Sequence, residues 1–323
     1  MKLRTHPLPG TDLRLSTFCC GLGDLFSAPR QSHEKVLEAF IDAGGNFFDT
    51  AHCYSFWLPG GNGLSEISIG EYVRKRGLKD IVIATKGGHP SAWHYRTIYN
   101  NEYLSPGRIS ADLDASLARL DCDAVSLYYL HRDDPRVPVG EIIDLLNMEI
   151  DRGRIRYPGV SNWSVQRISE ANEYARAHNR RPLVISSPPW SLAERKAQPQ
   201  AEISEYREPA DSLIAWHREH RFPVAPYTPT AHGFFAGPSD YPEKDYGTAE
   251  NHQRRERVHA LAKKRGASAA QIALAWLISH PFPVFPILGT KNPGRMTEAL
   301  GADSLLLTEA ELAWLACGEG TSH

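Results

Sequence analysis

Four polar residues each follow or end a short hydrophobic run. If they lie close together in the fold, they could carry out carbonyl reduction. They are Asp49, Lys86, His131 and Ser161. They lie roughly 30 to 45 residues apart, which is the length of one strand plus one crossover helix. If each run is a parallel strand of one barrel, all four side chains gather at its C-terminal rim, where such barrels keep their active sites.

The residue types suit the two transfers that reduction requires, a hydride to carbon and a proton to the developing alkoxide. Tyr54, five residues after Asp49, can act as the acid if its pKa is lowered. Lys86 within hydrogen-bond reach would lower that pKa, and Asp49 would keep Lys86 charged and oriented. A neutral His131 would point the substrate oxygen at Tyr54. The alternative is structural: a salt bridge, a strand-ending histidine and one of thirteen ordinary tyrosines.

Length and composition fit one large enzyme domain. At 323 residues and 36.0 kDa the chain matches a (β/α)₈ barrel as a single unit, residues 1–323, and a hydrophobic fraction of 41% can fill its core. A net charge of −2 and a pI near 6.7 disfavour nucleic acid or an anionic membrane as partner. No apolar span or signal-like h-region is visible, so we expect a cytoplasmic protein.

Cysteine and histidine usage indicates neither a disulfide framework nor a metal site. Five cysteines form an odd count without CxxC spacing, which favours reduced thiols in the cytosol. Fourteen histidines include no His-Glu-x-x-His or comparable ligand set, so no metal is expected. Cys53 beside Tyr54 is an oxidisable thiol to which we assign no catalytic role.

The hydrophobic pattern alternates between strands and helices along the whole chain. An N-terminal hairpin around Pro9-Gly10 is expected to cap the bottom of the barrel. The expected strands are 17–21, 47–48, 81–85, 124–130, 156–160, 183–186, 223–227 and 284–288. One helix is expected to begin at residue 32, one to begin near residue 110, and one, after strand five, to end near residue 177. The other helices are expected over 65–76, 139–151, 254–265, 269–279, 293–300 and 309–316. Long loops after strands two, three and six face the C-terminal end.

A doubly wound sheet would share this alternation but should carry a dinucleotide fingerprint. Gly21-Leu22-Gly23 is only a fragment of GxGxxG, because position 26 is Phe where the third glycine belongs. Gly21 also ends a strand without opening a clear helix. The pattern therefore favours the barrel.

Several motifs give the chain a family resemblance. The segments Asp49-Thr-Ala-x-x-Tyr54, Gly159-Val-Ser-Asn162, Gln271-Ile-Ala-Leu-Ala-Trp276 and Gly289-Thr-Lys-Asn-Pro-x-Arg295 are close to patterns of the aldo-keto reductase superfamily, bacterial type. The Asp, Tyr, Lys and His tetrad of that family matches Asp49, Tyr54, Lys86 and His131. The resemblance implies an NADP(H)-dependent oxidoreductase, of the alcohol dehydrogenase or carbonyl reductase type, on a (β/α)₈ barrel that binds the cofactor extended.

The resemblance also implies a cofactor site. Ser161 and Asn162 would hold the nicotinamide carboxamide, and Tyr227 would stack on the ring. The remaining cofactor-binding residues are predicted to be Gly21 and Leu22 after strand one, Thr228, Thr230 and Gly233 at the pyrophosphate, Gly289 after strand eight, and Thr290, Lys291 and Arg295 at the adenosine 2′-phosphate. Ser187 and Glu298 are also predicted to be cofactor-binding residues. Two positions depart from the family: Ser187 replaces the usual Gln beside the carboxamide, and Ala299, after Glu298, replaces an Asn that often contacts adenine.

The rim loops suggest the substrate. Trp57, Trp93, His94 and Trp190 combine aromatic faces with polar groups, which suits a sugar-like carbonyl or its alcohol, a carbohydrate rather than a lipophilic ligand. Two alternatives stay open: an NADP(H)-binding regulatory or redox-sensing barrel with little turnover, and a nucleotide-independent hydrolase or isomerase using Asp49 and Glu66. The sequence does not reveal the oligomeric state.

Overall fold

The fold comes from a computed structural model that describes residues 2–90, 103–196, 208–237 and 240–319. Its centre is a parallel sheet that curls into a barrel. The strands are β3 (Cys19–Gly21), β4 (Phe47–Asp49), β5 (Val82–Gly87), β6 (Val125–Leu130), β7 (Ile155–Ser161), β8 (Ile185–Ser187) and β9 (Ile287–Leu288), in the order β8-β7-β6-β5-β4-β3-β9.

The gap between β8 and β9 is closed by single bridges instead of a full strand. Val224 forms parallel bridges with Ser186 on one side and with Val284 on the other. Prolines at 223, 226, 283 and 286 lack the N–H groups that a regular ladder needs, so pairing here is intermittent. The eight predicted strand positions are therefore all present around the ring, and the predicted (β/α)₈ fold class is confirmed.

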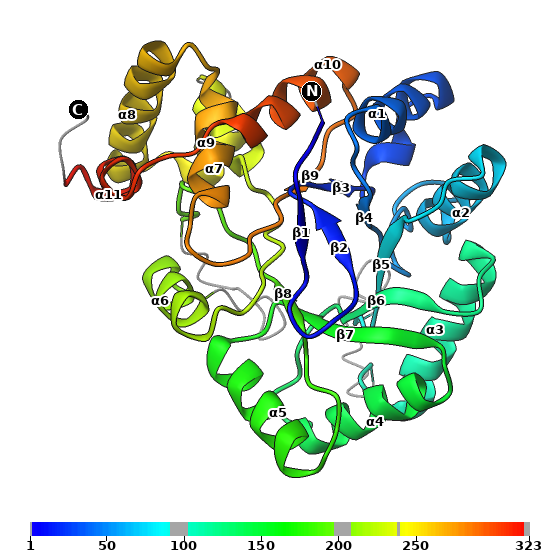
Figure 1. The fold of residues 1–323 in the computed structure, drawn as a ribbon. Coiled ribbons are helices and arrows are strands. Elements are labelled where there is room, and N and C mark those ends of the chain that lie inside the picture. Colours follow the sequence, from blue (N-terminus) through cyan, green and yellow to red (C-terminus); the bar gives the residue numbers. More distant parts are fainter. Residues whose placement is uncertain (1, 91–102, 197–207, 238–239, 320–323) are drawn as a thin grey trace.

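Helices surround the barrel, as Figure 1 shows. They are α1 (Arg30–Asp42), α2 (Leu64–Arg76), α3 (Pro106–Leu120), α4 (Val139–Asp151), α5 (Val165–Ala177), α6 (Ala210–His220), α7 (Asp240–Tyr246), α8 (Ala249–Arg265), α9 (Ala269–Ile278), α10 (Pro293–Leu300) and α11 (Glu309–Cys317). Short 3₁₀ turns are η1 (Leu25–Ser27), η3 (Ala231–Ala236) and η4 (Gly301–Ser304). In the described residues no helix is long and apolar enough to cross a membrane.

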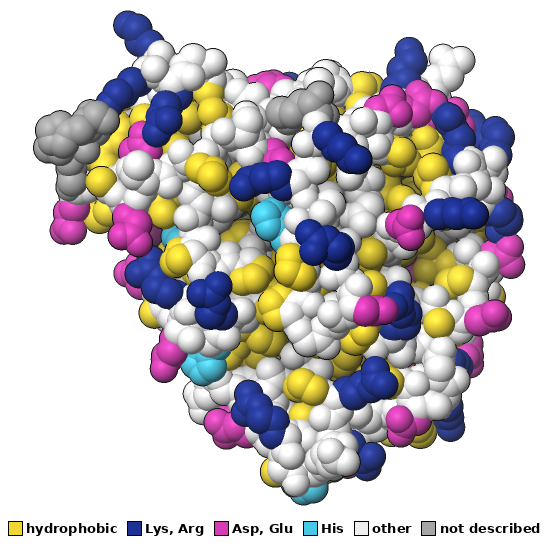
Figure 2. Space-filling model, viewed as in Figure 1, with side chains coloured by type: hydrophobic (Ala, Val, Ile, Leu, Met, Phe, Trp, Pro, Cys, Tyr) yellow, Lys and Arg dark blue, Asp and Glu magenta, His cyan; other side chains and the backbone are white. Residues whose placement is uncertain are grey.

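The predicted hairpin consists of β1 (Thr5–Pro7) and β2 (Arg14–Ser16), paired antiparallel. It crosses the centre of the barrel in Figure 1 and closes its N-terminal end. Leu8, Leu13 and Leu15 pack with buried barrel residues such as Phe47 and Phe285. Basic and acidic side chains alternate over this face, so it carries no field of a single sign (Figure 2). The hairpin leaves the opposite, C-terminal rim for a ligand.

Several element boundaries differ from the sequence predictions. The first strand is regular only from Cys19, while β5 and β7 extend far enough to include Lys86 and Ser161 themselves. Helix α3 begins at Pro106 because Ser105 caps it, and α8 begins at Ala249 because Thr248 does. Helices α6 and α7 were not predicted. The expectation of one domain over 1–323 stays a prediction.

One close approach fixes where the ring closes. Strands β3 and β9 run so near each other that a Cβ atom on Gly21 would lie 2.7 Å from the Ile287 side chain. A larger residue at this position would have to displace the Ile287 side chain of β9. Gly21 therefore contributes first to closure of the barrel, whatever else its backbone contacts.

Candidate active site

A cavity of about 960 Å³ opens at the C-terminal ends of the strands. It lies at the upper end of the roughly 300–1,000 Å³ typical of ligand pockets. Its wall includes the four tetrad positions Asp49, Tyr54, Lys86 and His131. The predicted gathering of strand-end side chains is thus present in the geometry.

The Lys86 ammonium group is the centre of the cluster. Nζ donates to Asp49 Oδ2 at 2.6 Å, to the Thr50 carbonyl at 2.8 Å and to Tyr54 Oη at 3.1 Å. These three bonds match the three hydrogens of an ammonium group. Lys86 and Asp49 are only 2% and 3% exposed, so the pair is fixed in place with little water around it.

Burial and charge act in opposite directions on this cluster. Burial alone disfavours the Lys86 cation, but Asp49 and Tyr54 outweigh it and raise the pKa of Lys86 well above its ordinary value. Burial raises the pKa of Tyr54 to about 12, and Lys86 opposes that rise without cancelling it. The expectation that Lys86 brings the Tyr54 pKa below its usual range is therefore wrong in this structure, because desolvation of the phenolate is the larger effect.

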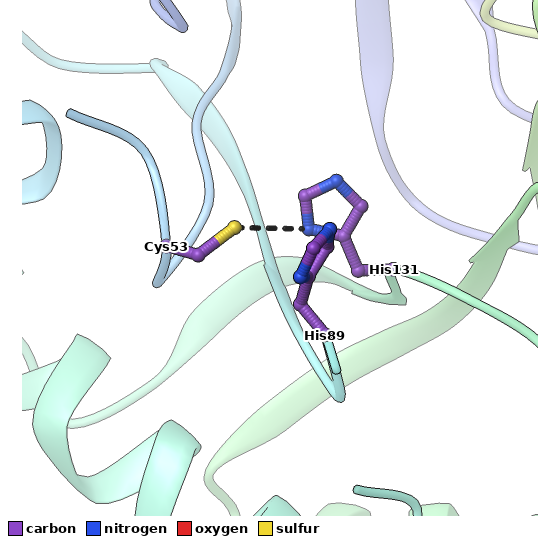
Figure 3. Close-up of side chains that lie close together, drawn as sticks. All are labelled: Cys53, His89 and His131. Atoms are coloured by element: carbon purple, nitrogen blue, oxygen red, sulfur yellow. Dashed lines mark hydrogen bonds between the residues drawn. The ribbon is translucent and has the colours of Figure 1, made fainter. Parts of the chain in front are cut away.

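His131 follows β6 and faces Cys53, whose Sγ lies 3.5 Å from His131 Nδ1 (Figure 3). Burial raises the pKa of the Cys53 thiol to about 12, and burial holds the pKa of His131 well below its ordinary value. The thiol therefore keeps its proton and the imidazole is neutral, and we assign the tautomer in which the thiol donates to Nδ1. The single hydrogen of the neutral imidazole then lies on Nε2, where it can be donated to a ligand.

The predicted carboxamide site is already hydrogen-bonded within the protein. Asn162 Nδ2 donates to the His131 carbonyl at 3.0 Å and to Ser161 Oγ at 2.9 Å. Asn162 Oδ1 accepts from Tyr227 Oη at 2.6 Å, and Ser161 Oγ donates to the Ser187 carbonyl at 2.7 Å. All four residues line the cavity. Both amide hydrogens of Asn162 are therefore used, so a carboxamide that needs a donor from Asn162 must exchange one of these bonds.

The segment after Tyr227 has an unusual backbone. Thr228, Ala231, His232 and Gly233 all have φ between +49° and +85°. This left-handed conformation is unfavourable for a β-branched residue such as Thr228. Thr228, Thr230 and Gly233 line the cavity, as predicted for a pyrophosphate-binding segment. Strain of this kind is found where surrounding structure holds a loop against a ligand.

A second hollow of about 360 Å³ adjoins the main cavity and shares Gly21, Asp24, Gly289, Thr290 and Arg295 with its lining. Helix α10 begins here, capped by Asn292, whose Oδ1 accepts from the Arg295 amide. Basic side chains beside a helix N-terminus favour a phosphate group. Lys291 lines only this smaller hollow.

Lys291 is not free in this hollow. Its Nζ forms an ion pair with Asp24 at 2.5 Å and donates to Ser27 Oγ at 2.7 Å. Asp24 was not predicted as a site residue, although it directly follows the Gly21-Leu22-Gly23 fragment. A phosphate held by Lys291 must compete with this carboxylate.

Two predicted site residues lie away from the cavity. Leu22 has a fully buried side chain in the core between barrel and helices, so only its backbone can be near a cofactor. Trp190 is 4% exposed and packs against Trp276, His280 and Phe282. The predicted substrate contact of Trp190 is wrong in this structure, because its indole fills the space behind β8.

The other predictions divide by position. Trp57 is 39% exposed and lines the cavity, with its ring centroid 6.3 Å from that of Tyr54. Gly289, Glu298 and Ala299 also line it. Trp93 and His94 lie outside the described residues. His89 is a lining residue that sequence reasoning missed, although it follows β5 directly after Gly87-Gly88.

Glu66, the second carboxylate of the hydrolase alternative, is a structural residue. It is fully buried on α2, where it accepts from Thr85 Oγ1 at 2.6 Å and from Arg119 at 3.1 Å. Arg119 also donates to the His52 carbonyl and to Asn62, which holds the loop that carries Tyr54. Glu66 does not line the cavity beside Asp49.

Comparison with known proteins identifies what the chain resembles. The model described as "Aldo/keto reductase family" matches residues 18–316. The chain is 29% identical to "Probable aldo-keto reductase 1" of Glycine max over 93% of this chain and 83% of that protein. It is 28% identical to "Aldo-keto reductase yakc, NADP(+)" of Schizosaccharomyces pombe, over 90% and 84%, and 27% identical to "Norsolorinic acid reductase B" of Aspergillus parasiticus, over 94% and 81%.

A solved structure with the same fold is that of a thermostable aldo-keto reductase in complex with the inhibitor epalrestat. The two folds superpose with a TM-score of 0.72 and 23% sequence identity, covering 97% of this chain and 99% of that one. At this identity the likeness establishes the fold alone.

The buried Asp49–Lys86 pair makes a stability prediction. Lys86→Met leaves the Asp49 carboxylate buried without its cation, and we expect a loss of about 3–5 kcal/mol in the free energy of unfolding. The double variant Lys86→Met/Asp49→Leu buries no charge and should be more stable than the single variant. Urea unfolding followed by fluorescence measures both, with Arg30→Met of the exposed Arg30–Glu34 pair as a control that should barely shift the midpoint. A double variant no more stable than Lys86→Met would contradict the buried ion pair.

Proposed function

The chain belongs to the aldo/keto reductase family, and from that premise we propose that it reduces an aldehyde or ketone to an alcohol with NADPH. The observation that carries this proposal is the Lys86-centred cluster, which presents the Tyr54 hydroxyl to a cavity large enough for a dinucleotide and a small carbonyl compound. NADPH, when bound, supplies the hydride to the carbonyl carbon. The protein's own residues position the substrate and supply the proton.

Tyr54 donates that proton to the carbonyl oxygen. The pKa of Tyr54, raised to about 12 by burial, keeps the phenol protonated at neutral pH but makes it a weak acid, so the phenolate must be stabilised as the proton leaves. The donation leaves a phenolate 3.1 Å from Lys86 Nζ, and the ammonium charge stabilises it. In this proposal Lys86 favours the product of proton transfer, and Asp49 keeps the ammonium oriented.

His131 positions the same oxygen. Its neutral Nε2–H is the second donor, and the ring lies 5.7 Å from that of Tyr54 between centroids. Two donors converging on one oxygen select the carbonyl orientation in which the hydride and the proton arrive on the correct atoms. Cys53 acts only through His131. Its thiol stays protonated and occupies the Nδ1 side of the ring.

The residues around the cavity fit a dinucleotide. The strained loop of Thr228 to Gly233 lines the same cavity as the Asn162–Tyr227 group. Thr290 and Arg295 line both hollows, and we propose that Arg295 binds the 2′-phosphate of the extended cofactor. The name of the Schizosaccharomyces pombe relative includes NADP(+), which supports the choice of NADP(H) over NAD(H).

A sugar-like carbonyl is the substrate class that we propose to test first. Trp57 offers an exposed aromatic face at the cavity wall, and His232 lies in the same lining. Trp190 is buried away from the cavity, so Trp57 supplies the aromatic surface in this proposal. The five cysteines are free thiols, in keeping with the reducing cytoplasm that we propose as the compartment.

Tyr54→Phe tests the proton donor. The variant keeps the aromatic ring but has no proton to give, so kcat should fall by several orders of magnitude while NADPH still binds. The value of kcat is measured from the rate of NADPH consumption with a panel of aldehydes and ketones. NADPH binding is measured by the quenching of protein fluorescence. Turnover close to that of the unaltered chain would mean that Tyr54 is not the acid. Quenching without turnover in the unaltered chain would favour the regulatory alternative.

Arg295→Ala tests the preference for NADPH. A charge-assisted bond contributes roughly 1.5–3 kcal/mol, so the Kd for NADPH should rise about 10- to 100-fold. The Kd for NADH, which has no 2′-phosphate, should change less than twofold. Arg14→Ala, on the hairpin at the opposite end of the barrel, is a matched control. Equal losses for both cofactors would show that Arg295 is structural.

Trp57→Ala tests the substrate class. If a sugar ring stacks on the indole, kcat/KM for an aldehydo- or keto-sugar should fall at least tenfold, whereas a short aliphatic aldehyde should lose much less. Steady-state rates with saturating NADPH give both values. A preference of a hundredfold for an aromatic aldehyde over the sugar, with the sugar unaffected by Trp57→Ala, would refute the sugar-like substrate and leave the reductase proposal standing.

A further inference from the structure

Three side chains that can bind a metal meet at the wall of the cavity. Cys53, His89 and His131 come from the three successive loops after β4, β5 and β6, and each lines the cavity. One ligand atom from each can be chosen so that all three lie within 4.8 Å of one another. Figure 3 shows the sulfur and the two imidazole rings turned toward one shared space.

The distance between the Cys53 sulfur and His131 Nδ1 equals the distance between two ligand atoms of a tetrahedral zinc site. Cys53 Sγ and His131 Nδ1 are 3.5 Å apart. Zinc bonds of about 2.3 Å to sulfur and about 2.0 Å to nitrogen, at a tetrahedral angle, place two such atoms about 3.5–3.6 Å apart. The other separations between the three ligand atoms are at most 4.8 Å, so His89 must lie closer to the other two ligands when a cation binds.

His89 has the outer contact that ligating histidines use. Its Nδ1 lies 2.5 Å from the Pro90 carbonyl oxygen, and a carbonyl only accepts, so Nδ1 carries the hydrogen and Nε2 has a free lone pair. A ligating histidine almost always donates its other N–H to a carbonyl, a carboxylate or water in this way. The ring also lies 4.7 Å from the His131 ring at 71°, which keeps the two imidazoles adjacent.

The donor set selects the class of cation. One thiolate and two imidazoles suit zinc and its chemical relatives, whereas Mg²⁺ and Ca²⁺ require oxygen ligands. Binding displaces the thiol proton of Cys53, so the sulfur brings one negative charge to the cation. The nearby Lys86 charge is already balanced by Asp49 at 2.6 Å, which limits the repulsion that a dication meets here.

We propose that Cys53, His89 and His131 form a binding site for Zn²⁺, with the fourth coordination position open to the cavity. No sequence motif marks the site, because its ligands come from three separate loops. If the proposed function holds, the cation and the carbonyl substrate exclude each other, since both occupy the space in front of His131. Metal binding itself requires no turnover and can be measured without it.

Cobalt(II) provides a direct readout of the ligand set. The full-length chain, kept reduced and freed of metals with a chelator, is titrated with CoCl₂ and then with ZnCl₂. We expect one Co²⁺ per chain, with a thiolate-to-cobalt charge-transfer band in the near ultraviolet and visible bands of tetrahedral intensity. Zn²⁺ should abolish these bands stoichiometrically. Competition with a chromophoric chelator gives the Zn²⁺ affinity.

Variants assign the ligands. Cys53→Ser should remove the charge-transfer band, and His89→Ala should weaken Zn²⁺ binding at least tenfold while the band persists at higher Co²⁺ concentration. Cys122→Ser, which alters an exposed thiol, and His232→Ala, which alters another histidine of the same cavity, are controls that should leave both readouts unchanged. His89→Asn and Cys53→Ala are the second variants if circular dichroism shows that either first variant is misfolded.

Two results would overturn the site: no charge-transfer band in the unaltered chain, or a band and affinity that survive Cys53→Ser. A band lost with Cys122→Ser would equally place the cation elsewhere. The exclusion of substrate is tested separately. Zn²⁺ should raise the KM for a carbonyl substrate in the unaltered chain and have at least tenfold less effect in His89→Ala; binding without any rise in KM would refute the exclusion and leave the site.

Discussion

The Lys86 ammonium group, buried with three hydrogen-bond acceptors around it, is the constraint on which the rest of the site depends. A lone buried cation would cost several kcal/mol, so its partners must be held in place by the fold. Asp49 ends β4 and Lys86 lies in the neighbouring β5, with Asp49 paired in register to Ala84. The parallel register therefore brings the carboxylate and ammonium together, and the turn after β4 brings the Thr50 carbonyl and Tyr54. A one-residue slip between β4 and β5 would turn Lys86 away from the cavity.

The same burial determines how each neighbour can act. Desolvation raises the pKa of Tyr54 and of Cys53 and lowers that of His131, so these three groups are neutral while Lys86 and Asp49 carry opposite charges. The cavity thus holds neutral proton donors beside one fixed ion pair. Negative charge that develops on Tyr54 during proton transfer is stabilised by Lys86 in a site of low polarity, where such an interaction is stronger than in water.

The sequence predicted those features that follow from strand periodicity and strand order. β6 and α4 matched closely because apolar patterns define them, and α10 did because Asn292 and Pro293 mark its start. The strand-end rule placed the tetrad around one cavity. The sequence-based predictions failed where packing between distant segments determines the position of a side chain. Trp190 follows a strand as a rim residue would, yet Trp276 and Phe282 form a place for it in the core. His89 joins Cys53 and His131 only through the barrel geometry, and the prolines at 223 and 226 interrupt a strand that its hydrophobic pattern predicted in full.

Both ends of the proposed cofactor path carry polar groups that are already bonded within the protein. Asn162 is shared between Tyr227, Ser161 and the His131 carbonyl, and Lys291 is held by Asp24 and Ser27. A dinucleotide would therefore exchange existing bonds for new ones, and each exchange contributes little net free energy. Under this proposal the affinity for the dinucleotide depends on protein groups that gain a hydrogen bond without losing another. It also depends on release of the backbone strain in the Thr228 loop. The Asp24 carboxylate repels any phosphate near Lys291 and thereby limits how tightly the 2′-phosphate end can bind.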